Sequence, residues 1–436
     1  MKLPEQKITK EQKQAIGLLS IGTFLEYFDL MLYVHMAVLL NDLFFPKTDP
    51  FVASLLTAFT FCATYVFRPI GALIFGYIGD NIGRKVTVIL TTFLMAGSCL
   101  VMSILPTYAE IGIYASFGMI LCRIIQGMSA MGECIGAELY LTEITKPPIQ
   151  YVVVSFIGIS TGVGATIALA FASFTTSHGL NWRYAFFAGT IIALIGGAAR
   201  TRLRETPDFA DAKRRVKNIV VKTDIDLEIL EQSDIWKEKL NKMTAISLFL
   251  IQCGWPICFY FVYIYCGDIL KNKFNYTSEQ VIHQNFIVSM VQLISSIVYG
   301  LLSYKIYPLI MLKVRLIISL IIAILSPYLL YNATSSFDIL IMQIIFILFA
   351  FSDFPAAPIF YKHFPVFKRY TFACMMYALG RGLTYIVTSF GLIYLVKYLG
   401  HYGFLVIILP VILGYGIGLF HFEKLEVGMR KRSQER

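Results

Sequence analysis

The chain has 436 residues, of which 57% are hydrophobic and 15% are charged, and its formal net charge is +10. A soluble protein of this length carries about a quarter charged residues, so this composition excludes a mostly water-exposed surface. The excess of Lys and Arg is typical of membrane proteins with cytoplasmic loops facing anionic lipid, which makes a nucleic-acid partner the weaker interpretation. Eight cysteines lie in or beside apolar stretches without a CxxC pair, so neither a disulfide set nor a metal site is expected.

Twelve apolar runs are long enough to suggest membrane helices, since a hydrocarbon core needs about 20 residues per helix. Their limits are 15–40, 53–78, 86–106, 111–142, 150–176, 184–201, 243–268, 282–303, 310–331, 337–360, 369–398 and 402–420. If the N-terminus is cytoplasmic, the segments on the cytoplasmic side hold 29 Lys and Arg residues and those on the outer side hold five. Positive charge favours the cytoplasmic side, so both termini are expected in the cytoplasm.

The segment 202–242 differs from the rest because it holds ten Lys or Arg and nine Asp or Glu. It is interpreted as a solvated cytoplasmic linker between two six-helix halves, the arrangement of a parallel-repeat transporter. The predicted fold is an all-α membrane protein of twelve helices. Its expected parts are a cytoplasmic N-terminus (1–14), an N-terminal half (15–201), the linker (202–242), a C-terminal half (243–420) and a cytoplasmic C-terminus (421–436).

Ionisable side chains inside the predicted helices are candidates for function, because a charge in lipid is costly unless it is paired or used. Acids that can gain and lose a proton are candidates for proton coupling: Glu26, Asp29 and Glu133, with Asp353 as a further acid. Residues suited to hold a solute are Tyr33, Arg68, Arg123, Gln126 and Arg381. Several lie near their helix midpoints and could meet at one level. The alternative is that they only form ion pairs between helices. Helices 3, 5, 6, 8, 9 and 12 are expected to carry charges only at their ends.

The loop between the second and third predicted helices reads Gly76-Tyr-Ile-Gly-Asp80-Asn-Ile-Gly83-Arg84-Lys85. Its acid can bond the N-terminus of a neighbouring helix, and Arg84 can reach a carboxylate such as Glu143. A conformational latch is therefore expected from Gly76, Asp80, Gly83, Arg84, Lys85 and Glu143.

This loop resembles the GxxxDxxGRK signature of the major facilitator superfamily. Further motifs resemble its metabolite:proton symporter family, with the nearest likeness to proline/betaine transporters. They are Leu25-Glu-Tyr-Phe-Asp29, Arg68-Pro-Ile-Gly71, Gln126-Gly127, Gly132-Glu133, Trp182-Arg183, Glu205-Thr-Pro207 and Phe364-Pro-Val-Phe-Lys-Arg-Tyr370. The second copy of the signature, Ser303-Tyr-Lys-Ile-Tyr-Pro308, has lost its acid and its Gly-Arg pair.

The resemblance implies no enzyme activity and no cofactor, with the proton as coupling ion. It implies symport of a small zwitterion by alternating access in the inner membrane of a bacterium. The expected partners are a small solute, protons and the bilayer, with no nucleic acid, and the chain is expected to be a monomer. Two alternatives stay open. One is a symporter of carboxylates such as 2-oxoglutarate, citrate or shikimate, and the other is a membrane sensor that transports nothing.

Overall fold

The computed structural model describes residues 8–45, 64–178, 181–201, 203, 205, 206, 210 and 241–434. Over these ranges the secondary structure is helical without a strand, as the sequence predicts. The first group of helices is α1 (Lys10–Phe44), α3 (Arg68–Asn81), α4 (Arg84–Ile104), α5 (Tyr108–Ile111), α6 (Ile113–Ala130), the π-helix η1 (Met131–Ile135), α7 (Gly136–Ile144), α8 (Ile149–His178) and α9 (Arg183–Arg200).

The second group follows the predicted linker, of which residues 211–240 lie outside the described part of the chain. Its helices are α12 (Lys242–Gln252), α13 (Gly254–Phe259), the π-helix η2 (Tyr260–Tyr265), α14 (Cys266–Phe274), α15 (Ser278–Leu302), α16 (Pro308–Asn332), α17 (Ser336–Leu348), α18 (Ala357–Tyr361), α19 (Val366–Leu399), η3 (Gly400–Tyr402) and α20 (Gly403–Gln434).

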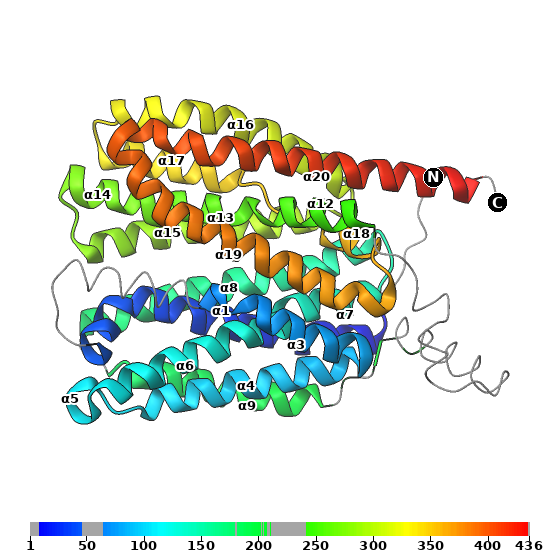
Figure 1. Cartoon of the computed structure of the whole chain (residues 1–436), viewed down its shortest axis with the longest axis horizontal. Helices are drawn as coiled ribbons and strands as arrows, with labels where there is room; N and C mark the ends of the chain where they lie inside the picture. Colours follow the sequence, from blue (N-terminus) through cyan, green and yellow to red (C-terminus); the bar gives the residue numbers. More distant parts are fainter. Residues whose placement is uncertain are drawn as a thin grey trace.

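The two groups lie side by side as two helical bundles, the first in the lower half of Figure 1 and the second in the upper half. They meet mainly where α3 packs along α19 and where α8 packs along α15. The first turn of α1, the last turn of α20, α7 and α18 all lie toward one end of the molecule, on the right in Figure 1. We call this the terminal end.

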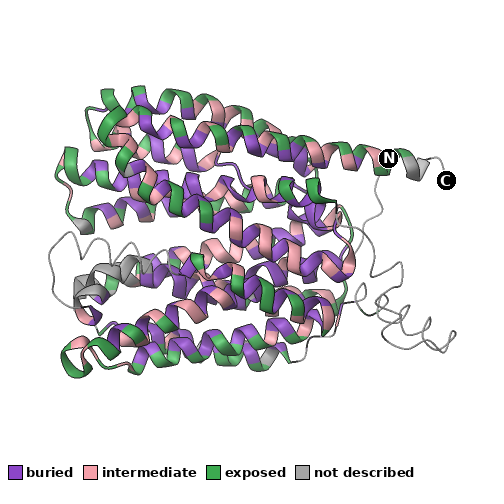
Figure 2. Ribbon diagram, viewed as in Figure 1, coloured by how far each residue is buried: buried purple, intermediate pink, exposed green. Residues whose placement is uncertain are grey.

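The outer faces of the bundles are apolar (Figure 2), as lipid contact requires. On α16 the exposed side chains recur every three or four residues and so share one helix face: Ile310, Val314, Ile317, Ile321, Ile324 and Tyr328. By length and composition, eight helical stretches of the described residues could cross a membrane. Phe186–Ile195 and Ser336–Leu348 are shorter apolar helices within the sixth and tenth predicted runs.

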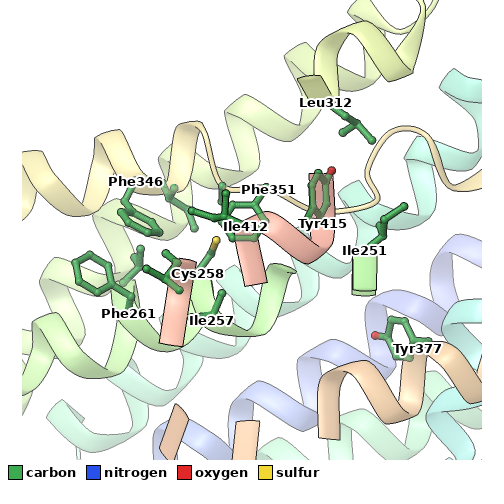
Figure 3. Close-up of a cluster of buried hydrophobic side chains, with 14 of the residues drawn as sticks. Ile251, Ile257, Cys258, Phe261, Leu312, Phe346, Phe351, Tyr377, Ile412 and Tyr415 are labelled. Carbon is green, nitrogen blue, oxygen red and sulfur yellow. The ribbon is translucent and has the colours of Figure 1, made fainter. Parts of the chain in front are cut away.

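A large apolar core fills the C-terminal bundle, where Phe261 packs against Phe346 (Figure 3). Phe261 also stacks with Phe404. Two predicted helices differ from their expected form beside this core. The run 337–360 is interrupted between Leu348 and Ala357, and Pro355, which has no backbone N–H to donate within a helix, lies in this interruption. The last helix continues past residue 420 to Gln434.

Candidate functional site

A cavity of about 150 Å³ lies between the two bundles. Its walls come from α1, α3, η1, α7 and α8 on one side and from α13, η2, α15, α16, α19 and the interruption after α17 on the other. A water needs roughly 10 to 15 Å³ by the same measure, so the space equals on the order of ten waters. That is the size of a small metabolite.

Aromatic rings form much of one side of the cavity wall. Tyr65 and Tyr385, from opposite bundles, have ring centroids 4.4 Å apart, and Phe259 lies 5.0 Å from Tyr263 and 6.2 Å from Tyr385. Trp255, beside Pro256 at the start of α13, also lines the space. Grouped aromatic faces attract a cationic or quaternary nitrogen.

Two predicted arginines, Arg68 and Arg381, line this cavity. The guanidinium of Arg68 lies 3.9 Å from the carboxylate of Glu26 and 4.6 Å from the ring centre of Tyr65. Arg381 lies over the ring of Tyr377 at 4.3 Å. Within the described ranges, no carboxylate lies within ion-pair distance of Arg381, and its Nε has no hydrogen-bond partner. A buried guanidinium that has no described carboxylate within ion-pair distance is suited to bind an anionic group of a solute.

Three further charged residues line the cavity. Glu138 and Arg315 were not candidates from the sequence, and Asp353 was named there only as a further acid. The hydroxyl of Tyr361 donates to Oε2 of Glu138 at 2.7 Å, and the amide of Gln252 donates to Asp353 at 2.9 Å. The prediction that the ninth helix carries charge only at its ends is wrong, because Arg315 is buried within α16 and reaches the cavity.

Arg315 secures the interruption between α17 and α18, which carries Asp353. It donates to the carbonyls of Phe354, at 2.7 Å, and of Ala350. Tyr415 donates to the carbonyl of Ser352 at 2.6 Å. Backbone carbonyls that are released from helical hydrogen bonds inside a membrane need other donors. Arg315 and Tyr415 supply these donors and so stabilise the interruption in the cavity wall.

Four of the predicted residues form a second cluster inside the N-terminal bundle and do not line the cavity: Asp29, Tyr33, Arg123 and Gln126. Arg123 donates to the side-chain oxygen of Gln126 at 2.8 Å and lies 4.0 Å over the ring of Tyr33. Asp29 interacts electrostatically with Arg123. Each of the four is at most 3% exposed. The side chain of Glu133 is outside the described set, although its backbone lies in η1.

The latch residues meet at the terminal end of the α3–α19 contact. Arg84 forms ion pairs with Asp80 at 3.2 Å and with Glu143 at 3.3 Å, and it donates to the carbonyl of Val366 at 2.7 Å. Gly76 lets the backbones approach closely, since a Cβ there would lie 2.7 Å from Cα of Thr371. Gly83 precedes α4, and the backbone N–H of Lys85 points to Glu205.

The latch also includes partners that were not assigned to it from the sequence. Arg369 of the C-terminal bundle forms an ion pair with Glu143 at 3.1 Å. Thr206 donates to the other oxygen of Glu143 at 2.6 Å, and Glu205 accepts from the backbone N–H of Arg84. Arg369, Glu205 and Thr206 all lie in motifs quoted for the family resemblance, and those motifs are the signal that could have identified them.

Comparisons with known proteins agree with this geometry. The chain is 36% identical over 212 residues to the inner membrane metabolite transport protein YhjE of Escherichia coli, covering 45% of this chain and 47% of that protein. It is 32% identical over 204 residues to a proline/betaine transporter of Salmonella typhimurium, covering 45% and 41%. The alignments therefore span about half the length of these curated relatives.

Solved structures of similar shape include the proton:xylose symporter XylE bound to 6-bromo-6-deoxy-D-glucose. The TM-score is 0.76 at 14% identity, over 96% of each chain. A partially occluded inward-open form of the Escherichia coli xylose transporter XylE gives 0.66 at 16% identity, over 95% and 97%. At these identities the likeness shows the fold alone, which these transporters share with this chain. The sequence profile of the Major Facilitator Superfamily matches residues 19–387, and the chain belongs to that superfamily.

Proposed function

We propose that this protein is a secondary active transporter that couples proton movement to the uptake of a small zwitterion of the proline or betaine type. It works by alternating access around the cavity between the bundles. The observation that carries the proposal is Arg381, a buried guanidinium in the cavity wall with no carboxylate of the described side chains within ion-pair distance. It would hold the carboxylate of the solute by paired hydrogen bonds.

The opposite character of the remaining wall supports a zwitterion over a simple anion. Tyr65, Phe259 and Tyr385 offer aromatic faces, and Glu138 and Asp353 offer carboxylates. Both kinds of group stabilise a positively charged nitrogen. A carboxylate symporter is the second candidate, and it is favoured by the presence of three arginines, Arg68, Arg315 and Arg381, in one cavity wall.

Proton coupling is assigned to acids that lie beside arginines. Glu26 is paired with Arg68 at the cavity, and Asp29 is near Arg123 in the second cluster. The proton is the only coupling agent proposed, and no cofactor is invoked. We further propose that a monomer acts in a bacterial inner membrane, with the terminal end in the cytoplasm.

Uptake into proteoliposomes tests this function. Purified protein should accumulate labelled proline or betaine when the lumen is alkaline relative to the outside, and the accumulation should stop when a protonophore collapses the gradient. Accumulation of 2-oxoglutarate in place of both zwitterions would select the carboxylate symporter. Absence of uptake and of counterflow exchange for all three solutes would contradict the transporter proposal and favour the sensor.

A further inference from the structure

One of the hydrogen bonds that join the two bundles at the wall of the cavity involves a carboxylate, and another links the hydroxyls of Tyr27 and Tyr377 at 3.2 Å. The hydroxyl of Tyr361, at the end of α18, donates to Oε2 of Glu138, in α7, at 2.7 Å. Tyr361 is fully buried, whereas Glu138 is partly exposed and lines the cavity. The carboxylate therefore faces the solute space with one side and the partner bundle with the other.

This bond lies between the cavity and the latch. Glu138 and Glu143 are five residues apart on α7, a separation of about 7.5 Å along a helix axis. Glu143 holds Arg84 and Arg369 at the terminal end, while Glu138 holds Tyr361 next to the cavity. Both contacts must break before the cavity opens toward the terminal end, because each connects α7 to an element of the other bundle.

The groups that act on Glu138 come from η1, α18, α19 and the segment that precedes α18. Asp353 precedes α18 and is a second carboxylate of the same wall, and Arg381 of α19 is the cation that faces both acids. The thiols of Cys134, in η1, and Cys374, in α19, are the other titratable neighbours.

The other packed helices place their ionisable groups farther along the bundle. The ionisable side chains of α8 are Tyr151 and His178, which lie near its two ends. Those of α4 are Arg84 and Lys85, at its first turn, and Cys99, in its second half. In α1, the predicted coupling acid Glu26 pairs with Arg68.

We propose that Glu138 is a proton-binding residue of the transport cycle and that its hydrogen bond from Tyr361 is the gate between the cavity and the terminal end. This inference rests on the proposed proton-coupled transport. A proton that enters the cavity binds a carboxylate oxygen of Glu138, and the same proton leaves to water after the cavity opens on the other side. No covalent bond to carbon forms or breaks in this step.

Protonation opens the gate because the hydrogen bond from Tyr361 to Glu138 no longer ends on a charged acceptor. A phenol donates a strong hydrogen bond to a carboxylate and a weaker one to a neutral carboxylic acid. Protonation of Glu138 therefore weakens the contact that closes the gate, and the open population rises. With a loss comparable to one ordinary hydrogen bond, we expect the open-to-closed ratio to rise about fivefold.

The test measures the gate directly, with Cys134 as the reporter because its side chain lies in the cavity wall. The other seven cysteines are replaced by Ser or Ala, and a membrane-impermeant maleimide is presented at the terminal end in vesicles. Maleimide adds to the thiolate, whose fraction falls on acidification, so each labelling rate is divided by that of Cys134 in the denatured protein at the same pH. Acidification should raise this relative rate about fivefold for the parent. Glu138→Gln, which resembles the protonated form, should give a high relative rate at both pH values, and Tyr361→Phe should do the same with little pH dependence.

Tyr307→Phe is the matched control. Tyr307 also donates to a carboxylate, Glu426, at 2.8 Å, but both residues belong to the C-terminal bundle. This variant should keep the pH response of the parent. If Glu138→Gln fails to reach the membrane, Tyr361→Phe decides, since a pH response equal to that of the parent would overturn the gate.

Uptake separates this inference from the proposed function. Glu138→Gln should lose accumulation driven by a pH gradient but keep counterflow exchange. If the unmodified protein accumulates solute and Glu138→Gln does so equally, the role of Glu138 is wrong while the transporter stands. If the unmodified protein moves no solute at all, the proposed function is wrong, and the labelling result alone shows whether the pH-sensitive gate exists.

Discussion

Asp80 binds the second turn of α19 across the boundary between the bundles, because its Oδ2 accepts a hydrogen bond from the backbone N–H of Thr371 at 2.9 Å. Its Oδ1 accepts from the backbone N–H of Tyr370 at 3.1 Å. A carboxylate near the N-terminal end of a helix interacts favourably with the helix dipole. The acid of the signature motif in the N-terminal bundle therefore joins that bundle to a helix of the C-terminal bundle.

Asp80→Asn should weaken this contact between the bundles and shift the protein toward states that are open at the terminal end. We expect initial uptake in proteoliposomes to fall about tenfold, with amounts in the membrane near those of the unmodified protein, because the contact biases a conformational equilibrium and lies outside the apolar core. Arg84→Ala should have a similar effect, since it removes the ion pairs to Asp80 and Glu143.

The eroded second loop supplies the control for the latch. Tyr304→Ala and Lys305→Ala change exposed residues at the corresponding place between α15 and α16. Uptake by these variants should stay within about twofold of the parent. Equal losses from both loops would mean that the asymmetry between the two copies has no functional importance.

Arg381→Lys tests the solute contact. Lysine keeps the positive charge but cannot offer the planar pair of donors or stack on Tyr377 in the same way. The apparent affinity for proline or betaine should fall at least about tenfold in both uptake and counterflow. Arg123→Lys is the comparison, because Arg123 lies in the cluster away from the cavity. If Arg123→Lys alone weakens solute affinity, the solute binds elsewhere.

The predicted coupling acids lead to a different experiment. Glu26→Gln or Asp29→Asn should abolish accumulation against a gradient while counterflow exchange persists, since exchange needs no net proton transfer. Both assays use the same vesicles, so a variant that loses both has lost its fold or its solute site. Continued pH-dependent accumulation in both variants would leave Glu138 and Asp353 as the coupling acids.

The fold could be predicted because long apolar runs and alternating loop charges leave few choices for a chain in lipid. Some contacts of the predicted latch could be anticipated because the spacing of Asp80 and Arg84 is fixed along the chain. Asp80 lies at the end of α3, Arg84 begins α4, and Glu143 lies near the end of α7. The sequence does not say which residue of the other bundle each of these groups contacts, such as the pairing of Arg369 with Glu143.

The site was harder to predict for the same reason. Glu26 and Asp29 are three residues apart, yet Glu26 lies beside the cavity arginine Arg68 and Asp29 lies in the second cluster. Helix periodicity places such residues on one side of a helix, but it does not say which neighbouring helix each one meets. Arg315 follows Lys313 by two residues, near the charged loop, and so resembles a helix-end charge.

Glu426 provides a test of stability against pH, because it lies in α20 beyond residue 420, where the predicted membrane span ends. Burial acts to raise its pKa, but hydrogen bonds from His363, Lys362 and Tyr307 outweigh burial and hold the pKa at about 2, below the ordinary 4.5. A carboxyl with a lowered pKa in the folded state stabilises the fold while it is ionised. Its contribution is complete above about pH 4.5 and is lost as the pH falls toward 2.

We therefore expect the unmodified protein in detergent to lose roughly 2 kcal/mol of unfolding free energy through this group between pH 5 and 2. In thermal unfolding, Glu426→Gln should be less stable than the unmodified protein at pH 5. Its stability should fall less on acidification, since the titrating carboxyl is gone. Glu423→Gln is the control one turn earlier, where the ion pair with Lys313 is about one-third exposed and contributes little. An equal acid-induced loss in Glu426→Gln and in the unmodified protein would show that the cluster around Glu426 does not stabilise the fold.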